Sequence, residues 1–239
     1  MSNGYPTAGR IPTLAERDVI PADELDDYER TMAFVVKYSA GNSVSDARRY
    51  VDGEPYALSY RKAWTNAPRL KATLLDASYA LTAYQGKRGW FSPADHEWID
   101  LVLGFDSGYW AFHAGHTANA ISAGIRLEAM EAIRDGCEDL LTEDEAFVVR
   151  FIRGVRDGEI TDDIWSAMSI RLGSVKGTIG FAYFVCVMWT HHRMMWAMGV
   201  PAMGATEWGQ MVDAYRSGAQ DPQAATQDYV WSTLRDSRE

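Results

Sequence analysis

The side chains best suited to chemistry lie in residues 107–125, a stretch that carries no formally charged residue. His113 and His116 are three positions apart, so on an α-helix their imidazoles share one face with Tyr109 and Phe112. An uncharged helix rich in alanine and glycine is typical of a buried, closely packed position. Buried polar groups need hydrogen-bond partners. We therefore expect an imidazole here to be hydrogen-bonded and able to act as a general acid or base.

A histidine that acts as an acid or base is usually oriented by a carboxylate, which can also raise its pKa. Glu97 and Asp100, on the helix expected just before this one, are among the nearest acids in the sequence. The alternative, in which both histidines are satisfied core residues, stays open at this point. The rings of Tyr109 and Phe112 also fit plain packing. His96, in the first turn of its helix, is expected to be solvated.

The elements that position these side chains are predicted to be helices. Ser92-Pro93 opens one of them, with Asp95 completing a capping box, and it runs to about Gly104. The next is expected from Ser107 to Ala123, with Gly124 as its stop. Apolar spacing and caps predict further helices at Asp23–Lys37, Pro68–Tyr84, Arg126–Asp135, from Thr142, from Thr161, at Ser174–Met198 and from Thr206.

No convincing run of alternating strands and no nucleotide-binding glycine loop interrupts these helices, so the predicted fold class is all-α, helix packed on helix. Three parts are expected: an N-terminal arm at residues 1–22, a helical domain at 23–201 and a C-terminal helical tail at 202–239.

Composition narrows the possible functions. With 239 residues, 47% hydrophobic and 23% charged, the chain is long and apolar enough to bury a substantial core. Its net charge of −10 argues against nucleic-acid partners. Cys137 and Cys186 form no Cys-x-x-Cys pair, which favours a reducing compartment. Residues 1–16 lack the apolar core of a secretory signal, and the apolar run at 181–189 is too short to cross a membrane, so a cytoplasmic protein is expected.

Several of these features together resemble the carboxymuconolactone decarboxylase and alkyl hydroperoxidase D-like family. Members carry a glutamate nineteen positions before a histidine, the separation of Glu97 and His116 here. The remaining matches are Arg10-Ile11-Pro12, Phe91-Ser92-Pro93, Gly108-Tyr109, Gly124 at eight positions after His116, and the block from Leu141 to Pro201 with Phe184, His192-Arg193 and Gly199-Val200-Pro201. The resemblance covers roughly residues 10–201 and implies a helical bundle of the hydroperoxidase D-like type that forms trimers or hexamers.

The chain departs from the family at its chemical positions. Tyr109 and Phe112 stand where redox members have the two cysteines of Cys-x-x-Cys-x-x-x-His, so peroxide reduction by those thiolates is not available. Decarboxylase-like members place a second glutamate at the position of Phe112. A thiol relocated to Cys137 or Cys186 is a poor substitute, because neither lies in a recognisable electropositive motif.

The resulting expectation is a cofactor-free lyase or isomerase that acts on a small enolisable keto or lactone acid. His116 would be the general acid–base and Glu97 would orient it, while His113 or Tyr109 would hold the enolate oxygen. Candidate substrate-binding residues are Trp110, Phe112, His192 and Arg193; Arg126, Arg171 and Arg193 are cations that could hold a substrate carboxylate, although surface ion pairing is their ordinary role. No metal, membrane or nucleic-acid partner is expected.

Two alternatives remain. One is a metal site that combines His113-x-x-His116 with Glu97 and with His191 or His192. The other is a non-catalytic oligomeric protein in which the Trp- and Met-rich helix around residues 188–198 forms an interface, although plain core packing is the more ordinary role of such residues.

Overall fold

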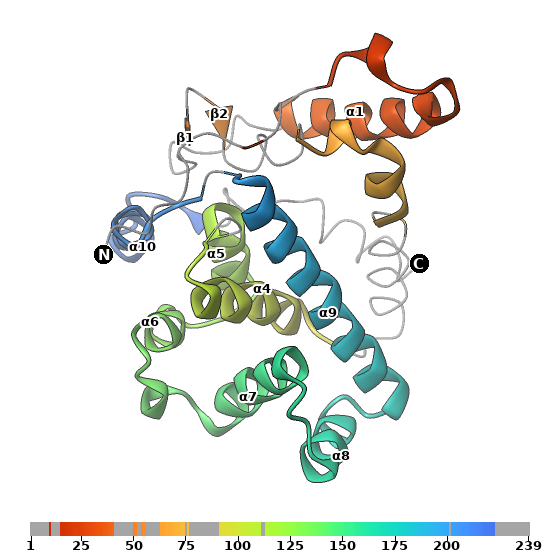
Figure 1. Cartoon of the computed structure of the whole chain (residues 1–239). Helices are drawn as coiled ribbons and strands as arrows, with labels where there is room; N and C mark the ends of the chain where they lie inside the picture. The colour runs from red at the N-terminus through yellow and green to blue at the C-terminus, as the bar shows by residue number, and fades with distance from the viewer. Residues whose placement is uncertain are drawn as a thin grey trace, which may run out of the picture.

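The structure, a computed structural model, describes residues 10, 15–40, 50–51, 54–55, 63–74, 76, 91–110, 113–200 and 202–222 (Figure 1). Within these residues the fold is all-helical, as predicted, apart from two short antiparallel strands, β1 (Tyr50–Val51) and β2 (Glu54–Pro55). The α-helices are α1 (Leu25–Ala40), α4 (Pro93–Ser107), α5 (His113–Ser122), α6 (Leu127–Asp135), α7 (Glu143–Asp157), α8 (Asp162–Arg171), α9 (Val175–Met198) and α10 (Ala205–Arg216). Short 3-10 turns lie at Arg17–Val19, Ala22–Glu24, Trp64–Asn66 and Glu138–Leu140.

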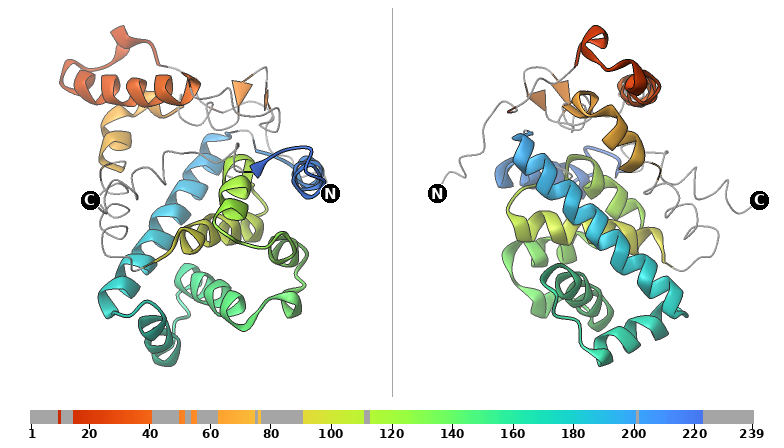
Figure 2. Two further views of the ribbon diagram at one scale, coloured as in Figure 1. Left: turned by 180° about the vertical axis from the view of Figure 1, so that it is seen from behind. Right: turned by 45° about the vertical axis from the view of Figure 1, so that its right-hand side comes forward.

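Helix α4 is the centre of the fold. It contacts α5, α6, α7 and α9, and the long α9 crosses it in the views of Figures 1 and 2. Every residue from Asp95 to Phe105 is buried, so α4 has no solvated face along this stretch. Any polar side chain on it must therefore find its partners inside the protein.

The start of α4 follows the predicted capping box. The Ser92 side chain accepts a hydrogen bond from the Asp95 backbone N–H, the Asp95 carboxylate accepts one from the Ser92 N–H, and Pro93 occupies the first helical position. These contacts satisfy donors that the first helical turn leaves open. Asp95 also forms an ion pair with Arg171 at 2.8 Å, which ties the start of α4 to the end of α8.

The prediction of one helix from Ser107 to Ala123 is wrong at its N-terminal end. Gly108 adopts a left-handed conformation with φ of 65° and ends α4, and α5 begins only at His113. Between them Trp110 forms an isolated antiparallel bridge with Met203. Tyr109 is therefore not on the helical stripe that holds His113 and His116.

Helix α10 packs into the main core through Trp208, Met211, Val212 and Tyr215. The Trp208 indole N–H donates to the Thr117 hydroxyl at 3.0 Å, and both side chains are fully buried. The segment after residue 201, expected to be a tail, thus supports α5 directly.

At the other end of the chain, the Arg10 backbone N–H donates to the Met198 carbonyl at 2.7 Å. The predicted helix Pro68–Tyr84 is helical at 68–74 and 76, and the rest of it lies outside the described residues, as does most of the predicted arm. Among the helices that the structure describes, none is by itself long and apolar enough to span a membrane; α8 and α9 pass that test only as a pair bent by 108°.

Candidate functional site

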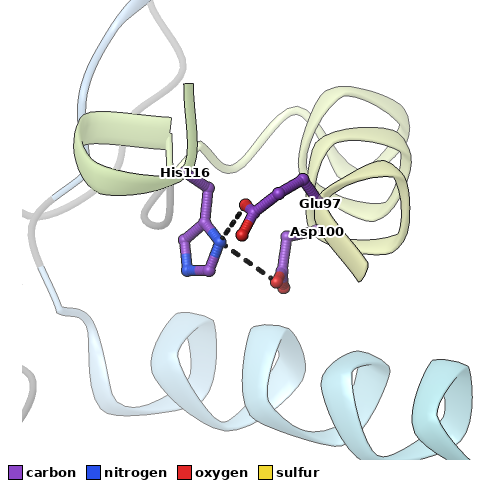
Figure 3. A group of neighbouring side chains, drawn as sticks. All are labelled: Glu97, Asp100 and His116. Atoms are coloured by element: carbon purple, nitrogen blue, oxygen red, sulfur yellow. Dashed lines mark hydrogen bonds and ion pairs between the residues drawn. The ribbon is translucent and has the colours of Figure 1, made fainter. Parts of the chain in front are cut away.

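Glu97, Asp100 and His116 meet between α4 and α5 (Figure 3). His116 Nδ1 lies 2.8 Å from Glu97 Oε2 and 3.2 Å from Asp100 Oδ2. The predicted pairing of Glu97 with His116 is thus confirmed as a contact. Both carboxylates are 0% exposed, whereas the His116 side chain is 19% exposed. The imidazole therefore connects two buried acids to the outside.

The close approach of α4 and α5 creates this contact. Glu97, Asp100 and Gly104 follow one another at i, i+3 and i+7 and share one face of α4. Glu97 meets His116, and one to two turns further along α4 Gly104 lies against the ring of His113. A Cβ at position 104 would lie only 2.6 Å from His113 Nε2, so glycine lets the two helices approach closely here.

Asp100 has imidazoles on several sides. In addition to the contact with His116, Asp100 Oδ1 lies 3.7 Å from Nε2 of His192 on α9. Asp100 Oδ2 lies 3.9 Å from Nε2 of His96. Burial acts to raise the pKa of Asp100, but His116 first, and then His192 and His96, outweigh it and lower that pKa to about 2. Asp100 is thus an anion throughout the neutral range.

The sequence predicts Asp100 only as a nearby acid, whereas the structure places it in the site, 3.2 Å from His116 Nδ1. Its position three residues after Glu97, on the same helical face, was the available signal, because two acids at this spacing point at one neighbouring helix. Glu97, Asp100 and His116 together form a group whose ligand atoms all lie within 4.8 Å of one another, close enough to hold a metal ion.

The expectation that His96 is solvated is wrong. Its side chain is 10% exposed and packs on Phe184 of α9, with ring centroids 4.7 Å apart. The cause is the central position of α4, which is covered even in its first turns. His96 Nδ1 lies 3.7 Å from Glu97 Oε1, so this ring belongs to the surroundings of the acid pair.

His113 lies apart from the acid pair, in an aromatic environment. It is 0% exposed and stacks on Phe105 with centroids 4.2 Å apart, while Trp110 meets it edge-on. Burial, followed by the charges of His192 and His116, lowers its pKa well below 6.5, so the ring is neutral. These surroundings fit a core residue better than an acid–base group.

The other predicted aromatic residues have different surroundings. The Tyr109 hydroxyl donates to the Val200 carbonyl, and the ring is 2% exposed, so this hydroxyl is already engaged in holding the chain. Trp110 is partly buried against Phe105 and Trp208. Phe112 lies outside the described residues.

On α9, His192 and Arg193 diverge. His192 is buried and faces Asp100, whereas Arg193 is exposed and stacks over Trp189 at 4.9 Å. Burial, and then the charge of Lys71, lowers the pKa of the neighbouring His191 to about 3. The predicted site residues that come together are thus Glu97, His116 and His192.

The remaining candidates have other roles in the structure. Arg126 pairs with Glu145 at 2.6 Å, and Arg171 pairs with Asp144 as well as Asp95, so both make the ion pairs that are ordinary for arginine. Cys137 and Cys186 are free thiols on the surface.

Comparison of the chain with family models, with curated proteins and with solved structures gave no match.

Proposed function

We propose that the chain is a cofactor-free carboxy-lyase or isomerase of the carboxymuconolactone decarboxylase and hydroperoxidase D-like type, acting on a small enolisable keto or lactone acid. The observation that supports it is the 2.8 Å contact of His116 Nδ1 with the fully buried Glu97. A carboxylate in this position holds the Nδ1 proton, so the lone pair of the neutral ring, and with it the basic site, is on Nε2. Figure 3 places that second nitrogen on the side of the ring that faces away from the acids.

The chemistry would be proton transfer at carbon. In isomerisation, His116 Nε2 takes the proton α to the carbonyl, the C–H electron pair forms an enolate conjugated with a substrate C=C bond, and the imidazolium returns the proton to the far carbon of that conjugated system. In decarboxylation of a β-keto acid, His116 Nε2 first takes a proton from solvent; the carboxylate then leaves as CO2, its C–C electron pair forms the enolate, and the imidazolium protonates the enolate carbon. Glu97 and Asp100 stabilise the imidazolium in both cases.

Deuterium uptake at the α-carbon, followed by NMR across a panel of β-keto and lactone acids in parallel with CO2 release, tests this proposal. Replacing His116 by alanine should lower the rate about 10²–10⁴-fold. Glu97→Gln removes a charged hydrogen-bond partner worth about 1.5–3 kcal/mol, which corresponds to a rate loss of about 10–160-fold.

Asp106→Asn is the matched control, because Asp106 lies on the same helix but pairs with Arg153 on the outside of the bundle. Its rate should equal that of the wild type. Equal rates in all four proteins, or no exchange with any acid of the panel, would refute the proposal.

A further inference from the structure

Glu97 and Asp100 bring two carboxylates into the interior, where imidazoles face them. Both are 0% exposed, and among the described residues their ion pairs are with imidazoles alone: His96, His116 and His192. A neutral imidazole offers a lone pair but no charge, and one imidazolium cannot offset two carboxylates. Buried anions without full compensation are costly, so a further cation at this position would stabilise the site.

The oxygen atoms themselves point to the same need. Both carboxylate oxygens of Asp100 and Oε1 of Glu97 are buried and have no hydrogen-bond partner among the described residues. In Figure 3 the two carboxylates turn toward the same side of the His116 ring. Buried carboxylates normally accept hydrogen bonds or coordinate a metal. Three of the four oxygens of Glu97 and Asp100 accept no hydrogen bond from the described residues.

We propose that Glu97, Asp100 and Nδ1 of His116 bind a divalent transition-metal ion. Their donor atoms lie within 4.8 Å of one another, with 2.8 and 3.2 Å between the imidazole nitrogen and the two acids. Metal–ligand bonds of about 2.0–2.2 Å put neighbouring donors about 3–3.5 Å apart, so an ion fits with small side-chain movements.

The donor set also selects the kind of ion. Carboxylate oxygens with imidazole nitrogen suit Zn²⁺, Mn²⁺ or Fe²⁺ better than Mg²⁺, which prefers oxygen donors and water. His192 Nε2 and His96 Nε2, at 3.7 and 3.9 Å from the Asp100 oxygens, are further nitrogen donors close to the site. Three protein donors would leave a coordination position open for water or a ligand.

This inference goes beyond the proposed function and competes with it at one atom. An ion on Nδ1 moves the remaining imidazole proton to Nε2, which is the atom that the proposed function uses as its base. The ion-bound form is therefore an alternative state of the same three side chains, in which His116 is a ligand and not a base.

In the first experiment, the chelator-treated full chain is titrated with ZnCl2 in a calorimeter, and the bound metal is then measured by metal analysis. Binding should saturate at one Zn²⁺ per chain, and Zn²⁺ at about a hundredfold excess over the dissociation constant should raise the melting temperature by about 5–10 °C. MgCl2 should give a much smaller shift. Absence of stoichiometric Zn²⁺, or equal shifts with both ions, overturns the proposal.

Long-range ¹H–¹⁵N NMR of the histidine imidazoles tests the metal ligands in the wild-type protein, without any substitution that could disturb folding. Zn²⁺ should move the Nδ1 resonance of His116 and place its proton on Nε2. If Zn²⁺ leaves the His116 resonances unchanged, or acts on His113 in their place, the assignment is wrong.

Two substitutions complete the test. Asp100→Asn keeps the shape of the side chain and should weaken Zn²⁺ binding at least about tenfold, whereas Asp106→Asn on the same helix should bind as the wild type does. Proton exchange is measured separately on chelator-treated protein. Exchange without Zn²⁺ binding overturns the metal site alone, and Zn²⁺ binding without exchange overturns the proposed function alone.

Discussion

The close approach of α4 and α5 at Gly104 gives the most direct test of how the site is built. Gly104→Ala adds a Cβ that would lie 2.6 Å from Nε2 and 2.8 Å from Cε1 of His113. The ring has little room to retreat, because it is 0% exposed and stacked on Phe105 with Trp110 at its edge. The added methyl group therefore has to displace the ring or separate the helices.

Two opposing effects set the size of the change. Alanine in place of glycine inside a helix stabilises by about 1 kcal/mol, because it restricts the unfolded chain and favours the helix. Overpacking a filled core costs about 1–3 kcal/mol. The expected result is a net loss of about 1 kcal/mol, which in a chain of this size lowers the melting temperature by about 2–4 °C.

A double-mutant cycle with His113→Ala isolates the contact. In that background the cavity accepts the Cβ, so Gly104→Ala should stabilise by about 1 kcal/mol and the coupling energy should be about 1–3 kcal/mol. Urea unfolding followed by tryptophan fluorescence measures all four proteins. A coupling energy of zero, or a stabilising Gly104→Ala in the wild-type background, would show that His113 does not lie against this glycine.

Three further predictions concern neighbouring residues. Tyr109→Phe removes the hydrogen bond to the Val200 carbonyl and should cost about 1–3 kcal/mol in urea unfolding while leaving proton-exchange rates unchanged; a loss of rate without a loss of stability would make this hydroxyl catalytic. The pKa of His113 is below 6.5 in the folded state, so the unfolded state alone gains this proton as pH falls. Stability should therefore decline between about pH 7 and pH 5, and less steeply in His113→Leu; equal slopes contradict this. Thr142→Ala removes the cap that accepts from the Glu145 N–H and should lower the unfolding free energy by about 1 kcal/mol, whereas an unchanged melting temperature would mean that this cap adds nothing.

The sequence was sufficient to predict the starts of the helices with clear caps and one contact of the site. Serine and threonine caps placed the starts of α4, α7, α8 and α9, since capping depends on a few adjacent residues. The spacing of Glu97 and His116 indicated the pairing that the structure contains.

Contacts between distant parts of the chain determine the features that could not be predicted from the sequence. His96 carries no local sign that α9 covers it, and Phe184, which packs on it, lies far along the chain. The start of α5 depends on Gly108, a residue that fits either a helix or its end, and on the pairing of Trp110 with Met203. The inclusion of Asp100 depends on the relative rotation of α4 and α5, which residue types alone do not determine.

The hydrogen bond between Thr117 and Trp208 spans 91 positions, which has a consequence for synthesis of the protein. Helices α4 and α5 leave the ribosome before α10, whose Trp208 donates to Thr117 of α5 and which is made near the end of the described chain. Until Trp208 emerges, the nascent chain exposes the aromatic surface of Phe105 and Trp110 that this residue later covers. Glu97, Asp100 and His116 are thus made before the helix that completes their surroundings, so a chain terminated before Trp208 contains these three side chains without the packing of Trp208 against α5.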